Sequence, residues 1–324
     1  MKQPLVTVFI PTYNGETYLE VLLQAVIQQV VDFEFEIQVI DSGSTDQTLE
    51  ILNKFHDISI LQIPNAEFSH GRTRNLAAQI ARGIYIVFLT QDAIPSSKHW
   101  LASLIDPMRK FQQVMGVVGK QTPRKNCPPY LKYDIQMVFD RQGASSAVSL
   151  FQLPKHRTLK QWEYDICTFY SDVNSATRVD LLKGEIPLRD VDYSEDIYFA
   201  QDILSAGYVK AYSPDAEVIH SNDLTLRQVR KRLYDETTGL INIGVELGKF
   251  GIFNLFSVIL KKSLGDQKRI INDISYSFSE KIKWSILNPC YVSEKWIGYF
   301  LAINFRNRSN SSKYSLEHGL RGDG

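Results

Sequence analysis

The side chains most suited to chemistry are carboxylates that follow apolar segments. Asp92 comes just beyond the apolar run from Ile84 to Leu89, at a depth where an unpaired carboxylate would be costly. A divalent cation that bridges this carboxylate to a diphosphate would give it a use. The alternative is a turn or capping residue before Ser96 and Ser97. The local sequence favours neither interpretation over the other.

A second carboxylate, Asp41, ends a strand-like segment and begins a turn rich in glycine and serine. A carboxylate at this place can accept the imide N–H of uracil or thymine, and the alternative is an Asx turn. Arg72 and Arg74 stand at the start of a helical segment, where cations oppose the helix dipole. Their placement indicates an anionic or polar partner, with a solvated surface as the alternative.

Glu195 and Asp196 open a further helical segment, where the helix dipole favours acidic residues. The functional alternative is a general base that deprotonates a hydroxyl. His220 ends a strand-like segment, and a lone histidine there is more often a satisfied hydrogen-bonding residue. As a metal ligand it would use neutral imidazole and complement Asp92.

Alternating strands and helices are expected to position these residues. Apolar runs predict strands at 5–10, 36–40, 58–63, 84–89 and 114–119, and helical periodicity predicts helices at 19–30, 45–55, 71–82 and 97–111. This alternation implies a mostly parallel sheet with helices on both faces. Ligands bind outside the carboxyl ends of such strands, where the polar clusters Thr12-Tyr13-Asn14, Asp41-Ser42 and Gln91-Asp92 converge.

The rest of the chain is expected to add four features. Residues 123–160 look like an insertion with a mobile loop, residues 195–205 form a helix, residues 217–219 form a short strand, and the chain beyond 224 is helical and locally basic. Pro107 is expected to kink or divide the helix at 97–111. The polar tail from about residue 307 is expected to fray.

Composition excludes several classes of protein. The formal net charge is zero, which gives no argument for nucleic-acid binding. Three cysteines far apart in the sequence argue against a disulfide framework and suit a reducing compartment. No signal peptide is visible, and no apolar run approaches the roughly 18 residues of a transmembrane helix. The G-x-x-x-x-G-K-[ST], G-x-G-x-x-G and G-x-S-x-G motifs are absent from the sequence. We therefore expect a cytoplasmic protein that handles phosphate through a metal ion.

A set of ordered motifs carries a family resemblance. They are Val8-Phe9-Ile10-Pro11-Thr12-Tyr13-Asn14, Val39-Ile40-Asp41-Ser42-Gly43-Ser44-Thr45-Asp46, His70-Gly71-Arg72-Thr73-Arg74-Asn75, Phe88-Leu89-Thr90-Gln91-Asp92-Ala93, Asn174-Ser175-Ala176-Thr177-Arg178, Ser194-Glu195-Asp196, Ala206-Gly207-Tyr208 and His220-Ser221. In order and spacing, over residues 4–235, they resemble the inverting family 2 glycosyltransferases of the GT-A fold, especially bacterial rhamnosyltransferases. The resemblance implies a three-layer α/β/α sandwich with a mostly parallel central sheet and a C-terminal helical extension. It places the GT-A domain at 1–224, with a nucleotide-binding half at about 1–122 and an acceptor half at about 123–224, a helical region at 225–306 and a flexible tail at 307–324.

The resemblance also implies roles for single residues. The nucleotide site would contain Pro11, Thr12, Tyr13, Asp41, Arg74, Gln91 and Asp92, with Asp41 at the base and Arg74 near the base or ribose. Asp92 and His220 would hold Mg²⁺ or Mn²⁺, and Asp196 would be the catalytic base. Asn174 and Glu195 would lie on the acceptor side. One departure is that the D-x-D motif reads Thr90-Gln91-Asp92, so its first acid is missing.

The implied reaction transfers L-rhamnose from dTDP-β-L-rhamnose to a lipid-linked saccharide in cell-wall or surface polysaccharide synthesis. The alternatives are a UDP-hexose donor and a sugar-nucleotide-binding subunit without catalysis. Arg227, Arg230, Lys231 and Arg232, followed by the apolar segment 251–260 and Lys261-Lys262, suggest a peripheral contact with the inner face of the cell membrane. A helix packed on the core and a homodimer contact are the alternatives. Nucleic acid is not expected as a partner.

Overall fold

The computed structural model describes residues 3–144, 146–191, 193–242, 244–307 and 311–316. Two compact units are present, one formed by Met1–Thr122 with Gln136–His220 and one formed by Pro123–Ile135 with Ser221–Gly324. Residues 123–135, which we expected in the first domain, thus group with the C-terminal helices. The expected frayed tail at 307–324 lies largely outside the described residues.

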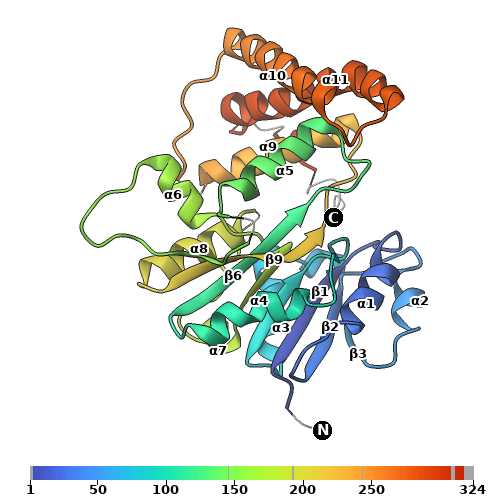
Figure 1. Cartoon of the computed structure of the whole chain (residues 1–324), viewed down its shortest axis with the longest axis vertical. Helices are drawn as coiled ribbons and strands as arrows, with labels where there is room; N and C mark the ends of the chain where they lie inside the picture. Colours follow the sequence, from blue (N-terminus) through green and yellow to red (C-terminus); the bar gives the residue numbers. More distant parts are fainter. Residues whose placement is uncertain (1–2, 145, 192, 243, 308–310, 317–324) are drawn as a thin grey trace. The chain divides into compact units, whose positions relative to one another are not determined.

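The first unit is built on a single sheet (Figure 1). In the described residues the sheet has nine strands in the order β3-β2-β1-β4-β8-β6-β9-β5, with β7 paired to β9. The strands are β1 (Val6–Thr12), β2 (Phe35–Asp41), β3 (Ile58–Gln62), β4 (Tyr85–Leu89), β5 (Ile94–Pro95), β6 (Val114–Thr122), β7 (Ser149–Phe151), β8 (Asn174–Arg178) and β9 (Val209–Ile219). Strands β5, β7 and β8 pair antiparallel to their neighbours, and the other six share one direction. The predicted, mostly parallel sheet is confirmed in this sense.

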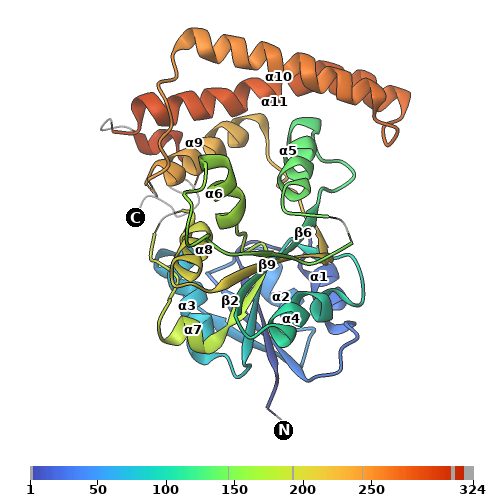
Figure 2. The same cartoon turned by 60° about the vertical axis from the view of Figure 1, so that its left-hand side comes forward.

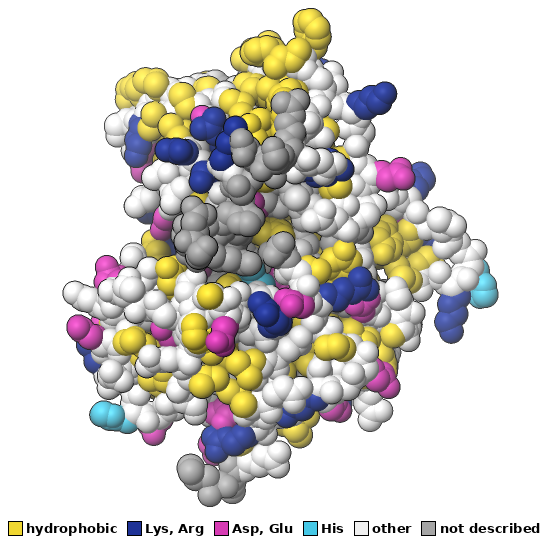
Figure 3. Space-filling model, turned by 180° about the vertical axis from the view of Figure 1, so that it is seen from behind, with side chains coloured by type: hydrophobic (Ala, Val, Ile, Leu, Met, Phe, Trp, Pro, Cys, Tyr) yellow, Lys and Arg dark blue, Asp and Glu magenta, His cyan; other side chains and the backbone are white. Residues whose placement is uncertain are grey.

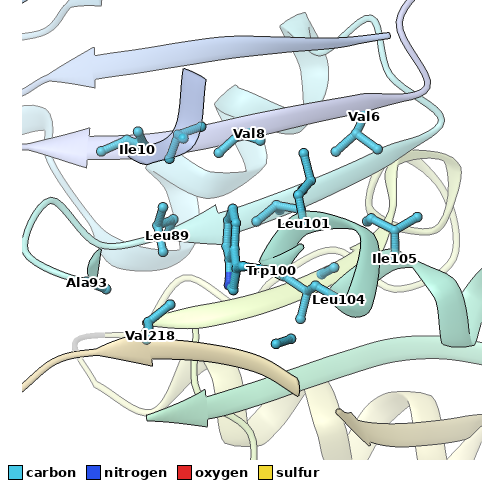
Figure 4. Packing of buried hydrophobic residues seen from close by; sticks show 14 of the residues in the cluster. Val6, Val8, Ile10, Leu89, Ala93, Trp100, Leu101, Leu104, Ile105 and Val218 are labelled. Carbon is cyan, nitrogen blue, oxygen red and sulfur yellow. The ribbon is translucent and has the colours of Figure 1, made fainter. Parts of the chain in front are cut away.

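Helices cover both faces of this sheet. They are α1 (Leu19–Ile27), α2 (Thr48–Leu52), α3 (His70–Ile80), α4 (Trp100–Lys110), α6 (Gln161–Thr168), α7 (Val179–Lys183) and α8 (Glu195–Ser205), with a 3-10 turn η1 (Asn65–Glu67). Alternate residues of β1, Val6, Val8 and Ile10, pack with α1, α2 and α4 in one apolar cluster around Trp100 (Figure 4). Phe9 points to the other face, where it meets Phe88 edge to face. This arrangement is the predicted three-layer sandwich.

Three elements differ from the sequence-based expectations. The expected insertion at 123–160 contains helix α5 (Pro129–Asp140) as well as β7. Strand β9 is eleven residues long, not three. Helix α4 continues through Pro107, which has no N–H to donate to the Ser103 carbonyl. The Ser213 hydroxyl donates to that carbonyl at 2.8 Å, so the carbonyl keeps a hydrogen-bond partner and the helix is not divided there.

The second unit is helical. It contains α9 (Leu226–Asn242), α10 (Ile252–Asn272), α11 (Phe278–Phe305) and a 3-10 turn η2 (Ser311–Tyr314). Helices α10 and α11 run side by side in both views (Figures 1 and 2). Tyr133, Ile270, Tyr276 and Trp284 form an apolar cluster between them. Among the described residues, no helix has the length and hydropathy needed to cross a membrane.

Candidate active site

Asp92 and His220 form the first part of the candidate site. Asp92 follows β4, His220 follows β9, and Asp92 Oδ2 lies 3.3 Å from His220 Nε2. The other ring nitrogen, His220 Nδ1, is 3.1 Å from Gln121 Oε1, while Gln121 Nε2 donates to Ser171 Oγ at 3.0 Å. With this orientation of the amide, the Gln121 oxygen accepts a hydrogen bond from the Nδ1–H group of His220. In neutral His220 this leaves the lone pair of Nε2 facing the carboxylate.

A lone pair and a carboxylate that face each other are stabilised by a cation, either a proton on Nε2 or a metal ion. Among the described residues, no cluster of three or more His, Cys, Asp or Glu side chains could hold a metal ion. Divalent ions that act on diphosphates are held by one or two protein groups, with phosphate oxygens and waters completing the shell. One carboxylate and one imidazole therefore fit Mn²⁺ or Mg²⁺ whose shell is completed by a diphosphate.

Three carboxylates and one guanidinium form the second part of the site. Arg74 Nη1 donates to Glu195 Oε1 at 2.8 Å, and Arg74 Nε lies 3.3 Å from Asp172 Oδ2. The Asp172 backbone N–H lies 3.4 Å from Asp196 Oδ2. Arg74, Asp172 and Glu195 are buried, whereas Asp196 is partly exposed. Of these four residues, Asp196 is therefore the one that is not fully enclosed by the protein.

The environment of this cluster raises the pKa of two carboxyls. Burial raises the pKa of Asp172 to about 6, with Glu195 adding to the rise and Arg74 opposing it. Burial also raises the pKa of Asp196 well above its usual value; Glu195 and Asp172 raise it further and Arg74 lowers it. A carboxylate with a raised pKa is a stronger base and is typical of acid–base sites.

The two parts lie at the same edge of the sheet. The Thr90 N–H, just beyond β4, donates to the Val173 carbonyl at 3.2 Å. Asp92 follows Thr90 by two residues, and Asp172 directly precedes Val173. The end of β4 and the start of β8 thus bring the Asp92 pair and the carboxylate cluster to one edge.

Helix α3 positions Arg74 by packing closely on the segment before α8. Gly71 allows this approach, because a Cβ there would lie 2.1 Å from the Arg189 carbonyl oxygen. Asn75 donates to the Leu188 carbonyl at 2.7 Å and accepts from the Leu188 N–H at 3.0 Å. The Arg74 guanidinium is buried against carboxylates, and its expected place near the base or ribose stays a prediction.

Asn174 and Glu195, which we expected on the acceptor side, are both buried in this structure. Asn174 is fully buried; its Oδ1 accepts from Trp100 Nε1 at 2.9 Å, and its Nδ2 donates to the Ala216 carbonyl at 2.7 Å. It therefore joins α4 to β9 and has no face for a ligand. Glu195 is buried and holds Arg74. Both are positioning residues in this structure.

Asp41 is engaged by its own turn. Its Oδ1 accepts from the Gly43 and Ser44 N–H groups at 3.1 and 3.0 Å, and its Oδ2 accepts from the Ser44 and Thr12 hydroxyls at 2.5 and 2.9 Å. These four bonds fill the acceptor positions of a carboxylate, and the side chain is fully buried. The expected contact of Asp41 with a base is not open in this conformation, and the Asx-turn alternative describes the residue. Thr12 is likewise buried as its partner.

Gln91 joins the end of β4 to the loop after β1. Its Oε1 accepts from the Tyr13 N–H at 2.9 Å, and its Nε2 donates to the Tyr13 carbonyl at 3.0 Å. Gln91, Tyr13 and Pro11 are all partly exposed. They are the residues of the expected nucleotide pocket, with Asp92, that a ligand can touch. Their role in nucleotide binding stays a prediction.

Sequence reasoning missed Asp172, Gln121 and Ser171 as members of the site. Asp172 and Ser171 stand directly before β8, so a search of strand starts as well as strand ends would have found them. Gln121 lies near the end of β6, beside the register shift at Gly119/Gln121. A single neutral residue of this kind carries no signal of its own in the sequence.

Comparison with known proteins identifies relatives of the chain. The model of the family described as glycosyl transferase family 2 matches residues 7–184. The O-antigen chain rhamnosyltransferase RfbN of Salmonella typhimurium is 30% identical over 237 residues, covering 71% of this chain and 70% of that protein. WbaN of Salmonella anatum, also an O-antigen chain rhamnosyltransferase, is 29% identical and covers 72% of this chain and 71% of its own length.

Solved structures share the fold at lower identity. The mannosyltransferase PcManGT from Pyrobaculum calidifontis, in complex with GDP-Man and Mn²⁺, has a TM-score of 0.58 and 17% identity, covering 92% of this chain and 88% of its own. Glucosyl-3-phosphoglycerate synthase from Mycobacterium tuberculosis, in complex with UDP, has a TM-score of 0.50 and 17% identity, covering 77% and 83%. These structures confirm the expected arrangement of sheet and helices.

Proposed function

The chain belongs to glycosyltransferase family 2, and from this membership we propose that it transfers L-rhamnose from dTDP-β-L-rhamnose to a hydroxyl of a lipid-linked saccharide, with inversion at the anomeric carbon. The observation that carries the proposed chemistry is Asp196, a partly exposed carboxylate with a raised pKa at the edge that holds Asp92 and His220. The similarity to O-antigen chain rhamnosyltransferases over 71% of the chain supports the donor sugar. Because the proposed acceptor carries a lipid, the enzyme would work at a membrane surface, and the side that we expect is the cytoplasmic face.

The proposed reaction is one in-line displacement. The acceptor hydroxyl oxygen forms a bond to the anomeric carbon while the bond from that carbon to the diphosphate oxygen breaks. Asp196 accepts the hydroxyl proton as the new bond forms. A single base without a nucleophilic partner gives inversion. Arg74 opposes the rise in the pKa of Asp196 and so favours the ionised form of Asp196, which is the form that accepts the proton.

Asp92 Oδ2 and His220 Nε2 are the atoms that would hold a divalent cation. Such a cation supplies charge that stabilises the departing diphosphate. Gln121 favours the tautomer with the proton on Nδ1 by accepting a hydrogen bond from it, which leaves the Nε2 lone pair for the cation.

Removal of these ligands tests the cation site. We expect Asp92→Asn and His220→Gln each to weaken Mn²⁺ binding in the presence of dTDP by about 100-fold, and Gln121→Leu by about 10-fold. Titration calorimetry measures this binding directly. Asp106→Asn, which removes an exposed carboxylate of α4, is the control and should bind as the wild type does. Mn²⁺ binding that is equal in all four variants would place the cation elsewhere.

Product analysis tests the donor. We expect turnover of dTDP-β-L-rhamnose to exceed that of UDP-glucose and UDP-GlcNAc by roughly 100-fold, because a pocket that hydrogen-bonds one sugar leaves buried groups unpaired with another. Rhamnose- or GlcNAc-capped lipid acceptors are used, and NMR of the product should show an α-linkage. A preference for UDP-glucose would favour the alternative, a UDP-hexose enzyme. A relative with a different printed activity is TarS of Staphylococcus aureus, a poly(ribitol-phosphate) β-N-acetylglucosaminyltransferase, which is 37% identical over 92 residues.

A further inference from the structure

Helices α10 and α11 carry large apolar side chains that the fold leaves exposed. On α10, Phe253 is 86% exposed and Phe256, Leu260 and Leu264 are each more than half exposed. Their spacing of three and four residues places them on one face of the helix. Hydrophobic side chains gather over the helices at the top of the view in Figure 3.

This apolar stripe continues around the turn between the two helices. Ile271 is 56% exposed at the end of α10, Ile274 is fully exposed in the turn, and Phe278 is 81% exposed at the start of α11. Ile282 follows one helical turn later and is half exposed. We define the docking stripe as Phe253, Phe256, Leu260, Leu264, Ile271, Ile274, Phe278 and Ile282.

The second unit does not need the docking stripe for its own packing. Leu255 and Ile270 of α10 are buried, as are Trp284 and Val292 of α11. Ile270 and Trp284 pack in one apolar cluster of the unit, and Val292 packs in another. Exposed large apolar side chains that gather in this way, apart from the core-forming residues, mark contact with a partner or a membrane.

Basic side chains border the docking stripe. Lys261 and Lys268 are exposed and lie seven residues apart, so both project along the same side of the stripe on α10. The nearby acidic groups are engaged within the unit. Asp266 is buried and accepts from Asn288 Nδ2 at 3.0 Å, and Glu280 caps the start of α11. The border of the stripe is therefore cationic.

We propose that the docking stripe lies on the surface of an anionic lipid bilayer, with its apolar side chains at the acyl boundary and its lysines at the headgroups. A cationic border complements anionic headgroups. A second copy joined through the same face would bring two lysine rows together and repel. This inference rests on the proposed function in one respect, since a lipid-linked acceptor requires the enzyme at a membrane.

The basic residues of α9 lie outside the docking stripe, and their expected membrane contact stays a prediction. Arg227, Arg230 and Lys231, which we expected to contribute to a membrane contact, line a cavity of about 230 Å³ together with Lys313 and Tyr314. They are therefore kept unchanged in the variants that test the stripe.

Vesicle binding by the full chain tests the proposal. We expect binding to phosphatidylcholine vesicles with about one-third phosphatidylglycerol to be at least about 10-fold stronger than to phosphatidylcholine alone, and to weaken with salt. The double variant Phe253→Glu/Phe256→Glu should lower this binding by about 100-fold. Trp162→Glu, which changes an aromatic residue that is 60% exposed on α6, is the matched control and should bind normally.

A second pair of variants tests the electrostatic part. Lys261→Glu/Lys268→Glu should lower the preference for anionic vesicles by about 10-fold, whereas Lys98→Glu, an exposed lysine of the first unit, should leave it unchanged. Light scattering of each protein in solution reports its oligomeric state.

Two results would overturn the proposal. One is wild-type protein that shows no preference for anionic vesicles, or whose binding survives Phe253→Glu/Phe256→Glu. The other is a dimer that this double variant converts to a monomer, which would assign the stripe to a second copy. Transfer to a water-soluble acceptor is measured on the same proteins and should be unchanged. If the wild type showed no transfer to this acceptor, that result would count against the proposed function. It would not change the conclusion from vesicle binding.

Discussion

Replacing Asp196 by asparagine is expected to lower kcat by about 10²–10⁴-fold, because the amide cannot accept the proton of the acceptor hydroxyl. Binding of dTDP should change by less than about twofold, since the proposed loss falls in the transition state and not in the ground state. Asp196 is the partly exposed carboxylate of its cluster, whereas Asp172 and Glu195 are buried around Arg74. Single-turnover transfer and calorimetric titration with dTDP separate the two quantities.

Asp202→Asn is the matched control for this prediction. Asp202 lies on the same helix, α8, and pairs with Arg189 on the outside of the unit. An exposed ion pair of this kind contributes little, so its variant should turn over within about twofold of wild type. If Asp196→Asn were as active as Asp202→Asn, Asp196 would not be the base. A subunit that binds the donor without catalysis would show no transfer in the wild type either.

The pH dependence of the wild type follows from the same carboxylate. A base must be ionised to act, so kcat/KM should fall as the pH drops through the pKa of Asp196. Because that pKa is raised by burial and by Glu195 and Asp172, the acidic limb should lie well above the usual value of about 3.9 for an aspartate. An acidic limb at the usual value would indicate a solvated base.

The fold was predictable where a buried strand consists of consecutive apolar residues. Strand β4, for example, is buried along its whole length, and the polar residues Thr90 and Gln91 follow it. Strand β9 was only partly predicted because Lys210 interrupts its apolar pattern. That lysine is fully buried and donates to Gln142 Oε1 and to the Phe169 carbonyl, and burial lowers its pKa to about 7. Its partners are distant in sequence, so local pattern could not reveal the strand.

The same reason limits prediction of the site. Asp92 and Asp196 could be selected because a carboxylate at a strand end or a helix start is visible locally. The partner of Arg74 could not be predicted, because Glu195 is 121 residues away from it in sequence. An arginine at a helix start indicates an anionic neighbour, and this much was correct. Whether the anion is a ligand or a buried carboxylate depends on packing that the sequence does not display.

Replacing Arg74 by methionine is therefore expected to destabilise the protein by about 3–5 kcal/mol near pH 8, because it leaves buried carboxylates without their cation. Arg74 is buried between Glu195 and Asp172, at 2.8 and 3.3 Å. Arg189→Met, which breaks the exposed pair with Asp202, is the control and should cost less than about 1 kcal/mol. Arg74→Lys keeps the charge but cannot span both carboxylates, so it should fall between the two.

The pH dependence of this loss distinguishes electrostatics from packing. The pKa of Asp172 is raised to about 6 in the folded protein, so the folded state binds protons more readily than the unfolded chain. Without Arg74 that pKa rises further, and protonation relieves the uncompensated charge as the pH falls. Urea unfolding should therefore show a smaller difference between wild type and Arg74→Met below about pH 6 than above it. If the difference in stability were the same at both pH values, Arg74 would stabilise the protein through packing and not through its charge. Phe88 is one such packing neighbour, because its ring centroid lies 5.8 Å from the guanidinium carbon of Arg74.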